Sequence, residues 1–180
     1  TDGSWEFLLA PGSYRLSWSR QQNTGGGQVL NGSRTIVIEK GKTYGIVGLN
    51  GAGKTTFFNL VAGFIKSPGA VFSYDERAVL RSDIAFMDTD LFFYPKLTAR
   101  EFLSVFPMSS ADYNEEKLAQ LFKFPLDGFM EEFSTGMKKK LLLQSQIKQD
   151  KHIYILDEPF NGLDLETNKI LEVIIGILNE

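Results

Sequence analysis

The 180-residue sequence has no cysteine, which excludes disulfide bonds and zinc sites built from thiolates. It also lacks long hydrophobic runs: apolar stretches such as VIIGIL are far shorter than the ~18–20 residues that span a bilayer. Neither sign of charge predominates, and the net charge of −3 gives no electrostatic basis for binding nucleic acid. We therefore expect neither a membrane-spanning helix nor a nucleic-acid partner.

Hydrophobic residues are plentiful by contrast, at 43% of the chain, and 15 of them are phenylalanines. Length and composition predict one domain, or one domain with a lobe, around an aromatic core. Residues 5–9 and 14–18 each alternate between apolar and polar side chains, and Pro11-Gly12 lies between them. The pattern predicts two strands joined by a turn. With a third strand at 34–38, it defines an antiparallel β portion over residues 1–40.

The next stretch alternates between strands and a helix, as is typical of an α/β core. We expect a short buried strand at 44–47 and a helix over 54–65 that Pro68-Gly69 ends. Short strands are predicted at 70–75 and 84–87, which completes the first half of the core.

Helical features replace this pattern between residues 95 and 149. Thr98 and Glu101 have the spacing of a capping box, and leucines then recur at helical spacing. The strand–helix pattern resumes after this stretch. We therefore predict an α/β fold whose core comprises residues 41–94 and 150–180, with a helical subdomain inserted over 95–149.

The stretch GLNGAGKTT (residues 48–56) fits the pattern G-x-x-x-x-G-K-[ST] between a predicted strand and a predicted helix. Glycines let backbone N–H groups wrap a triphosphate, and the helix N-terminus faces the phosphates. Lys54 is assigned to the β and γ oxygens and to catalysis, and the Thr55 hydroxyl to Mg²⁺. The residues assigned to nucleotide contact are Asn50, Gly51, Ala52, Gly53, Lys54, Thr55 and Thr56. The context predicts a P-loop NTPase (RecA-like) core; a glycine-rich turn without a ligand is the alternative.

Two adjacent acids, Asp157 and Glu158, end the predicted buried strand Ile153–Leu156. Carboxylates at the tip of a buried strand are costly unless something there needs negative charge. Asp157 is assigned to Mg²⁺ beside residues 48–56, which we call the phosphate loop. Glu158, one residue further, faces elsewhere and is assigned as the catalytic group that orients or deprotonates the attacking water. A helix cap or a surface salt bridge is the alternative for each acid.

From about Val29 to Glu180 the sequence resembles the nucleotide-binding cassette of ABC-type ATPases. The stretch FSTGMKKK (residues 133–140) is similar to the family's signature loop, usually L-S-G-G-Q, in the S-x-G-M-K form frequent among single-cassette exporters. The residues that match this loop are Ser134, Thr135, Gly136 and Met137, with Thr135 in place of the first glycine. The resemblance implies that the loop reaches the γ-phosphate bound by a partner chain. An N-cap serine before a solvated lysine run is the alternative.

The stretch FNGLD after Glu158 resembles the family's D-loop, and the resemblance implies that Asp164 lies near the partner's phosphate loop. Phe160 stands where a small polar residue is more usual. A plain turn at Asn161-Gly162 is the alternative. The two interpretations are compatible, because a D-loop can also contain a turn.

Two catalytic elements of the family are altered. Thr89, flanked by Asp88 and Asp90, takes the position of the family's Mg²⁺-contacting Gln. Thr89 or one of these acids is therefore a candidate Mg²⁺ ligand, and an acidic loop without a ligand is the alternative. The family's switch histidine falls beyond Glu180. The single histidine, His152, is not a match and is expected to be exposed at a strand start.

Two contact surfaces are also inferred from the resemblance. The aromatic residue that stacks on adenine is matched by Trp18, with Tyr14 as second candidate and simple sheet packing as the alternative. The stretch LFFYP (residues 91–95) lies where the family's membrane partner docks. Its aromatic side chains form either an exposed anchor patch or part of the packing of the helical subdomain.

The resemblance implies an ATP-binding and ATP-hydrolysing subunit that uses ATP and Mg²⁺. It would act as a head-to-tail homodimer or paired cassette on a transmembrane permease, at the cytoplasmic inner face of the membrane. Because the chain ends before the switch histidine, we expect it to hydrolyse ATP weakly or not at all. The alternatives are a soluble ABC ATPase without a transport role, and a nucleotide-gated structural module with little turnover.

Overall fold

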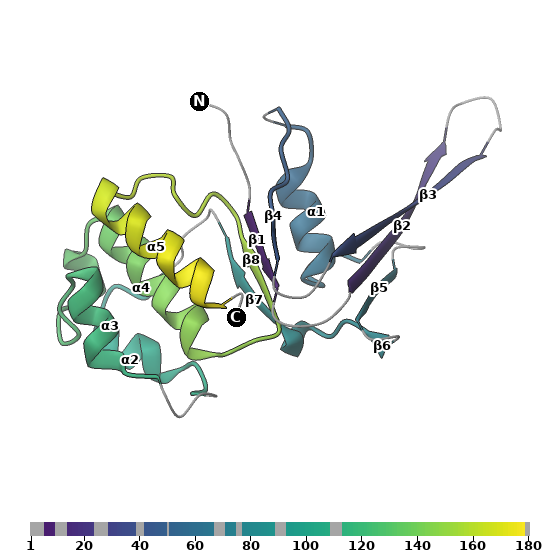
Figure 1. Cartoon of the computed structure of the whole chain (residues 1–180). Helices are drawn as coiled ribbons and strands as arrows, with labels where there is room; N and C mark the ends of the chain where they lie inside the picture. Colours follow the sequence, from purple (N-terminus) through teal and green to yellow (C-terminus); the bar gives the residue numbers. More distant parts are fainter. Residues whose placement is uncertain are drawn as a thin grey trace.

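The computed structural model describes residues 6–9, 14–23, 29–38, 42–49, 51–66, 71–74, 77–88, 93–108 and 113–178. Its strands form two sheets (Figure 1). The first, the core sheet, has the order β4-β1-β8-β7, with bounds Thr43–Tyr44, Glu6–Leu9, Ile153–Leu156 and Ile84–Met87. The second has the order β3-β2-β5-β6, with bounds Val29–Ile38, Tyr14–Asn23, Val71–Tyr74 and Arg77–Ala78.

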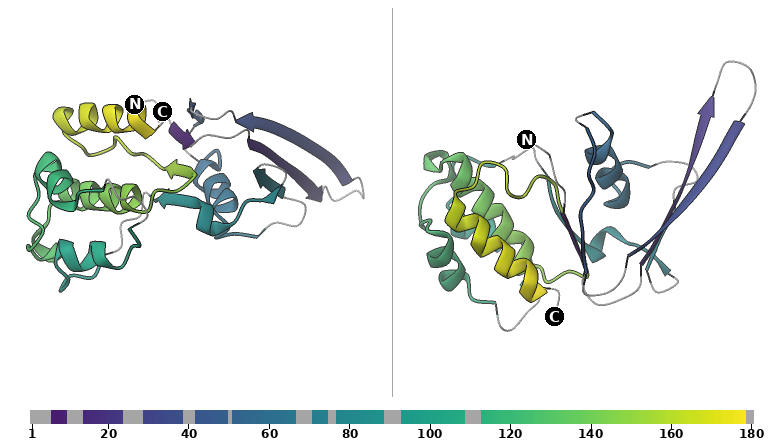
Figure 2. Two further views of the ribbon diagram at one scale, coloured as in Figure 1. Left: turned by 60° about the horizontal axis from the view of Figure 1, so that its bottom comes forward. Right: turned by 45° about the horizontal axis from the view of Figure 1, so that its top comes forward.

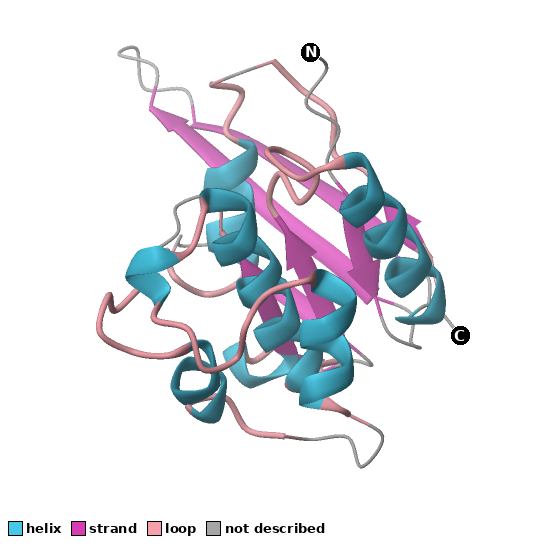
Figure 3. Cartoon of the chain, turned by 90° about the vertical axis from the view of Figure 1, so that its left-hand side faces the viewer, coloured by secondary structure: helices cyan, strands magenta, loops and turns pink. Residues whose placement is uncertain are grey.

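The helices flank the core sheet on both faces. They are α1 Lys54–Val61, α2 Ala99–Ser104, α3 Glu115–Phe122, α4 Thr135–Lys148 and α5 Leu165–Leu178, with short 3₁₀ turns at Arg81–Asp83 and Met130–Glu132. Helices α2 to α5 gather on one face of the core sheet, and α1 lies on the other, between the two sheets (Figures 1 and 2). Figure 3 shows the helical face turned toward the viewer, with the strands behind it. The long hairpin of β2 and β3 projects away from the helices (Figure 2).

Strand β1 corrects the expected pairing of the first residues. It does not form a hairpin with β2; it lies between β4 and β8, antiparallel to both, with Phe7 opposite Tyr44 and Ile155. Strand β5, expected in the core, pairs instead with β2 of the second sheet, and the short strand β6 pairs with β5. Alternation of apolar side chains fixes the faces of a strand but not its neighbours, so the pattern was compatible with either sheet. The boundaries of the predicted domains otherwise stay a prediction.

Strand β8 is buried on both faces, as predicted. Ile153 and Ile155 belong to a hydrophobic cluster that the sheet forms with Phe58 of α1. Tyr154 and Leu156, which point the other way, belong to the larger cluster shared with the helices on the opposite face. Because strand side chains alternate, this one strand contributes to two cores.

The ends of the helices follow local chemistry. The capping box at α2 is confirmed: the Thr98 N–H donates to Glu101 Oε2 at 2.8 Å, and Thr98 Oγ1 accepts from the Glu101 N–H at 3.2 Å. Helix α1 ends at Val61, four residues earlier than predicted. Gly63 has φ +76°, and the next residue, Phe64, donates its N–H to Asn59 O at 2.9 Å, which closes the helix.

The strand before the phosphate loop is shorter than expected. The sequence predicts a buried strand at 44–47, but β4 ends at Tyr44 and Val47 is 74% exposed. The prediction of burial was wrong because an apolar run does not by itself distinguish a buried strand from an exposed loop.

Removing the Ile155 side chain tests the role of β8. Ile155 is fully buried, so Ile155→Ala should lower the free energy of unfolding by about 2–5 kcal/mol. The matched control is Ile177→Ala, because Ile177 is 62% exposed and its loss should cost less than about 1 kcal/mol. Urea denaturation followed by circular dichroism measures both values. Equal losses would contradict the central place given to β8.

Candidate nucleotide site

The phosphate loop runs from Gly48 into α1. Gly51 and Gly53 have φ +81° and +90°, a left-handed backbone that side chains disfavour, and Gly53 is the N-cap of α1. Lys54 is buried, and its ammonium donates to Gly48 O at 2.7 Å and to Leu49 O at 3.0 Å. The loop therefore curls around the lysine at the N-terminus of a helix, an arrangement suited to anions.

Asp157 meets this loop from the end of β8. The Thr55 hydroxyl donates to Asp157 Oδ2 at 2.8 Å, and the Asp157 N–H donates to Met87 O of β7 at 2.9 Å. Burial raises the pKa of Asp157. The Thr55 hydrogen bond and nearby Lys54 oppose this shift, whereas the neighbouring acids Asp88 and Glu158 add to it. The expected meeting of loop and acid is thus present in the geometry.

The second oxygen of Asp157 suits a cation. Asp157 Oδ1 is buried, and within the described part of the chain it has no hydrogen-bond partner. A hard cation bound by oxygen ligands satisfies such an atom, and Thr55 adds a hydroxyl beside it. The described residues hold no group of three acids or histidines that would make a complete metal cage. Mg²⁺ usually takes only one or two carboxylates together with substrate phosphates and water, so these residues fit Mg²⁺.

Glu158 lies on the turn that follows β8. Its φ is +49°, a left-handed conformation uncommon for a side-chain-bearing residue. Its carboxylate accepts a hydrogen bond from Asn161 Nδ2 at 3.0 Å, and its carbonyl accepts from Lys139. The two acids therefore have different partners, as their assignments require.

The signature stretch begins α4. Ser134 is the N-cap, and its hydroxyl accepts from the Met137 N–H at 3.2 Å. Ser134 and Thr135 are exposed, whereas Met137 packs against the larger hydrophobic core. A Cβ added to Gly136 would lie 3.5 Å from Gly162 O, so this helix start lies against the stretch that resembles the D-loop.

The lysines that follow are not a solvated run. Lys139 is buried and bonded to backbone carbonyls, and Lys140 forms a 2.9 Å ion pair with Asp164. Asp164 also accepts from the Thr167 N–H and hydroxyl, both at 2.8 Å, which caps the start of α5. The N-cap part of the alternative for this stretch is confirmed by Ser134, whereas a solvated run is wrong for Lys139 and Lys140, which have partners within the chain. Sequence reasoning missed Lys139 and Asn161 as partners of Glu158, because a lysine run and an Asn-Gly turn carry no signal for such pairing.

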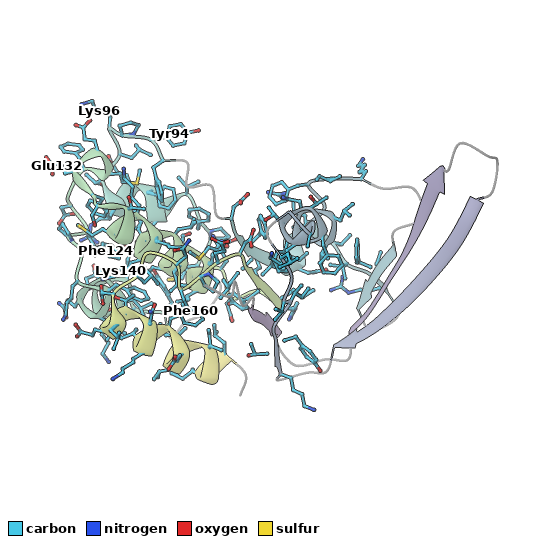
Figure 4. All side chains as sticks on the ribbon, turned by 90° about the horizontal axis from the view of Figure 1, so that it is seen from above. Tyr94, Lys96, Phe124, Glu132, Lys140 and Phe160 are labelled. Atoms are coloured by element: carbon cyan, nitrogen blue, oxygen red, sulfur yellow. The ribbon has the colours of Figure 1, made fainter. Side chains whose placement is uncertain are left out.

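Other expected residues are only partly described. Asn50 and Thr89 lie outside the described residues. Trp18 lies in β2 opposite Arg34, and its role stays a prediction. In the stretch LFFYP, Phe93 packs on Phe102 with ring centroids 5.3 Å apart. Tyr94 is 60% exposed and projects from the helical group on the side away from α5 (Figure 4).

His152 is exposed immediately before β8, as predicted. No helix in the part of the chain that the structure describes is long and apolar enough to cross a membrane.

The fold agrees with comparisons to known proteins. Residues 33–161 match the family described as ABC transporter. The match covers more than half of the chain, so the chain belongs to the ABC transporter family. A solved structure described as the ATP binding subunit of an ABC transporter has a TM-score of 0.75 at 24% identity, over 93% of this chain and 75% of that one. This likeness confirms the α/β fold of the P-loop ATPase type.

Two relatives come from Bacillus subtilis (strain 168). The ABC transporter ATP-binding protein YtrB is 29% identical over 165 residues, which cover 86% of this chain and 56% of YtrB. The ABC-type transporter ATP-binding protein EcsA is 32% identical over 154 residues, which cover 77% of this chain and 62% of EcsA. The chain thus spans less than two thirds of the length of either relative. Both relatives are described as ATP-binding proteins of ABC-type transporters.

Asp157→Asn removes a buried charge while keeping the shape of the side chain. Because burial raises the pKa of this carboxyl, its charged form destabilises the nucleotide-free chain at neutral pH. We expect the thermal midpoint at pH 7 without Mg²⁺ to rise by roughly 2–4 °C, the shift that about 1 kcal/mol produces in a chain of this length. Calorimetry measures this midpoint, and a lower value would contradict the interpretation.

Asp164→Asn is the matched control, because the pKa of this carboxyl is shifted in the opposite direction and the thermal midpoint should change in the opposite direction. Hydrogen bonds from Thr167 and the ion pair with Lys140 lower the pKa of Asp164 from its usual 3.8. Its charged form therefore stabilises the fold above that pH, and this stabilisation is lost as the pH falls through the lower folded value. The midpoint of Asp164→Asn should fall at pH 7, and the deficit should shrink as the pH drops below 3.8. If the midpoint of Asp164→Asn fell equally at pH 7 and below pH 3.8, the charge of Asp164 would not be the origin of the stabilisation.

Proposed function

We propose that the chain is the ATP-binding and ATP-hydrolysing subunit of an ABC transporter. The single observation that carries the proposal is the contact between Thr55 of the phosphate loop and Asp157 of β8, which leaves one buried carboxylate oxygen ready for a cation. A loop built only as a turn would not require a buried, incompletely paired acid beside it.

The residues of the loop divide the work of binding. The backbone from Gly51 to Gly53 wraps the phosphates at the start of α1, and the Lys54 ammonium turns from Gly48 O and Leu49 O toward the β and γ oxygens. Thr55 and Asp157 hold Mg²⁺. Bound there, the ion neutralises phosphate charge and orients the terminal oxygens. Trp18 is the proposed adenine contact, and Thr89 a further Mg²⁺ ligand.

Glu158 carries the hydrolytic step in this proposal. Its carboxylate leaves Asn161 and accepts a proton from water as the water oxygen bonds to the γ-phosphorus. The bond between the γ-phosphorus and the bridging oxygen breaks, and ADP and phosphate are released. Exposed Ser134 and Thr135 contact the γ-phosphate held by a partner chain, in a head-to-tail homodimer or paired cassette.

The proposed partner of the chain is a transmembrane permease. Exposed Tyr94, beside the partly buried Phe93 ring, offers one aromatic contact for it at the surface of the helical group. The proposed location is the cytoplasmic inner face of the membrane.

Lys54→Ala tests the phosphate loop. Because Lys54 is the ammonium enclosed by the loop, its loss should weaken binding of a fluorescent ATP analogue at least about tenfold. The matched control is Lys66→Ala, an exposed lysine beyond α1, which should bind the analogue as the parent does. Fluorescence titration measures both affinities. If Lys54→Ala bound the ATP analogue as tightly as the parent, the assignment of the loop to nucleotide binding would be wrong.

Glu158→Gln tests the hydrolytic step. The amide cannot accept the proton from water, so phosphate release should fall at least about 100-fold while analogue binding stays within twofold. An ATP-bound dimer should then accumulate, measurable by size-exclusion chromatography with light scattering. Glu172→Gln, an exposed acid of α5, is the control. A measurable parent turnover that Glu158→Gln retains in full refutes its role.

A further inference from the structure

Lys139 is a buried cation that the nucleotide site does not account for. Its side chain is 6% exposed, and its ammonium donates to the carbonyl oxygens of Glu158 and Asn161, the latter at 2.6 Å. An ammonium taken out of water is costly unless hydrogen bonds replace its hydration. Here the replacing acceptors are the first and last carbonyls of the turn that carries Glu158.

That turn has a conformation that needs support. Glu158 has a positive φ of 49°, which persists only where the surrounding structure over-determines it. The Asn161 N–H donates to Glu158 O at 3.2 Å, and the Asn161 side chain holds the Glu158 carboxylate at 3.0 Å. Lys139 binds the same carbonyl from outside the turn, so it joins the turn to another element.

The other element is α4, whose N-cap is Ser134. Lys139 lies five residues after this cap. Two further contacts join the beginning of α4 to the loop after β8. Gly136 approaches Gly162 O, and Lys140 pairs with Asp164. The beginning of α4 is therefore attached along the whole loop that follows β8, and Lys139 makes the contact nearest to Glu158.

We propose that Lys139 is a positioning residue that fastens the turn of Glu158 to α4, so that the catalytic carboxylate follows the position of the signature loop. A shift of α4, for instance when Ser134 engages an anion, moves the ammonium and the two carbonyls with it. The effect on turnover rests on the proposed ATPase function, whereas the attachment itself does not.

Hydrogen–deuterium exchange of the nucleotide-free chain tests the attachment. Lys139→Met removes the donors and the charge at similar length and should raise exchange of the amides from 158 to 163 about tenfold. Lys139→Arg keeps cationic donors and should restore most of the protection. Lys169→Met, an exposed lysine of α5, should leave these amides unchanged. If Lys139→Met does not purify as a folded chain, Lys139→Gln replaces it with the same readouts.

Kinetics test the consequence. Lys139→Met should lower kcat about tenfold, keep the affinity for the ATP analogue within twofold, and be rescued largely by Lys139→Arg. A simple loss of fold would lower affinity and kcat together.

Unchanged exchange at 158–163 in Lys139→Met overturns the attachment. Raised exchange with an unchanged kcat in an active parent overturns the positioning role. A parent that neither binds nor hydrolyses ATP, yet shows the expected exchange in all variants, refutes the proposed function and supports the attachment.

Discussion

The hydrogen bond from Thr55 to Asp157 is the contact on which the site depends, because it joins residues 102 positions apart. The loop needs glycines in left-handed conformations, and the buried carboxylate at the end of β8 needs polar partners. Together they define one small volume where a hydroxyl, a carboxylate and an ammonium converge. The two hydrophobic cores on either side of β8 hold this volume in place, since the strand cannot shift without disturbing both.

The sequence was most informative where chemistry restricts residue choice. The phosphate loop, the acid pair and the capping box at Thr98 were predictable, because each needs particular residue types at fixed spacing. The helical subdomain within residues 95–149 and strand β8 were also predictable, from helical spacing and from apolar content respectively. Their existence follows from short-range rules that a single sequence contains.

What could not be predicted depends on long-range pairing. An alternating strand such as β1 fits either sheet, and only the completed fold decides between them. The same limit applies to Lys139, whose neighbours in sequence are also lysines. Nothing in KKK marks the middle residue as the buried one; the direction of α4 and the path of the chain after β8 do so. Asn161 reads as a turn residue, and its bond to Glu158 appears only once that turn is built.

The place of β1 in the core sheet has a consequence for how the chain acquires its structure during synthesis. Residues 6–9 leave the ribosome before their partner β8, which follows almost 150 residues later. Until then β1 can pair with β4 alone among the described strands of the core sheet, and the sheet cannot close. Contacts so distant in sequence form slowly, because the entropy of closing the intervening loop is lost before the contacts form. Until β8 emerges, the growing chain therefore exposes an unpaired strand edge, which chaperone binding would protect.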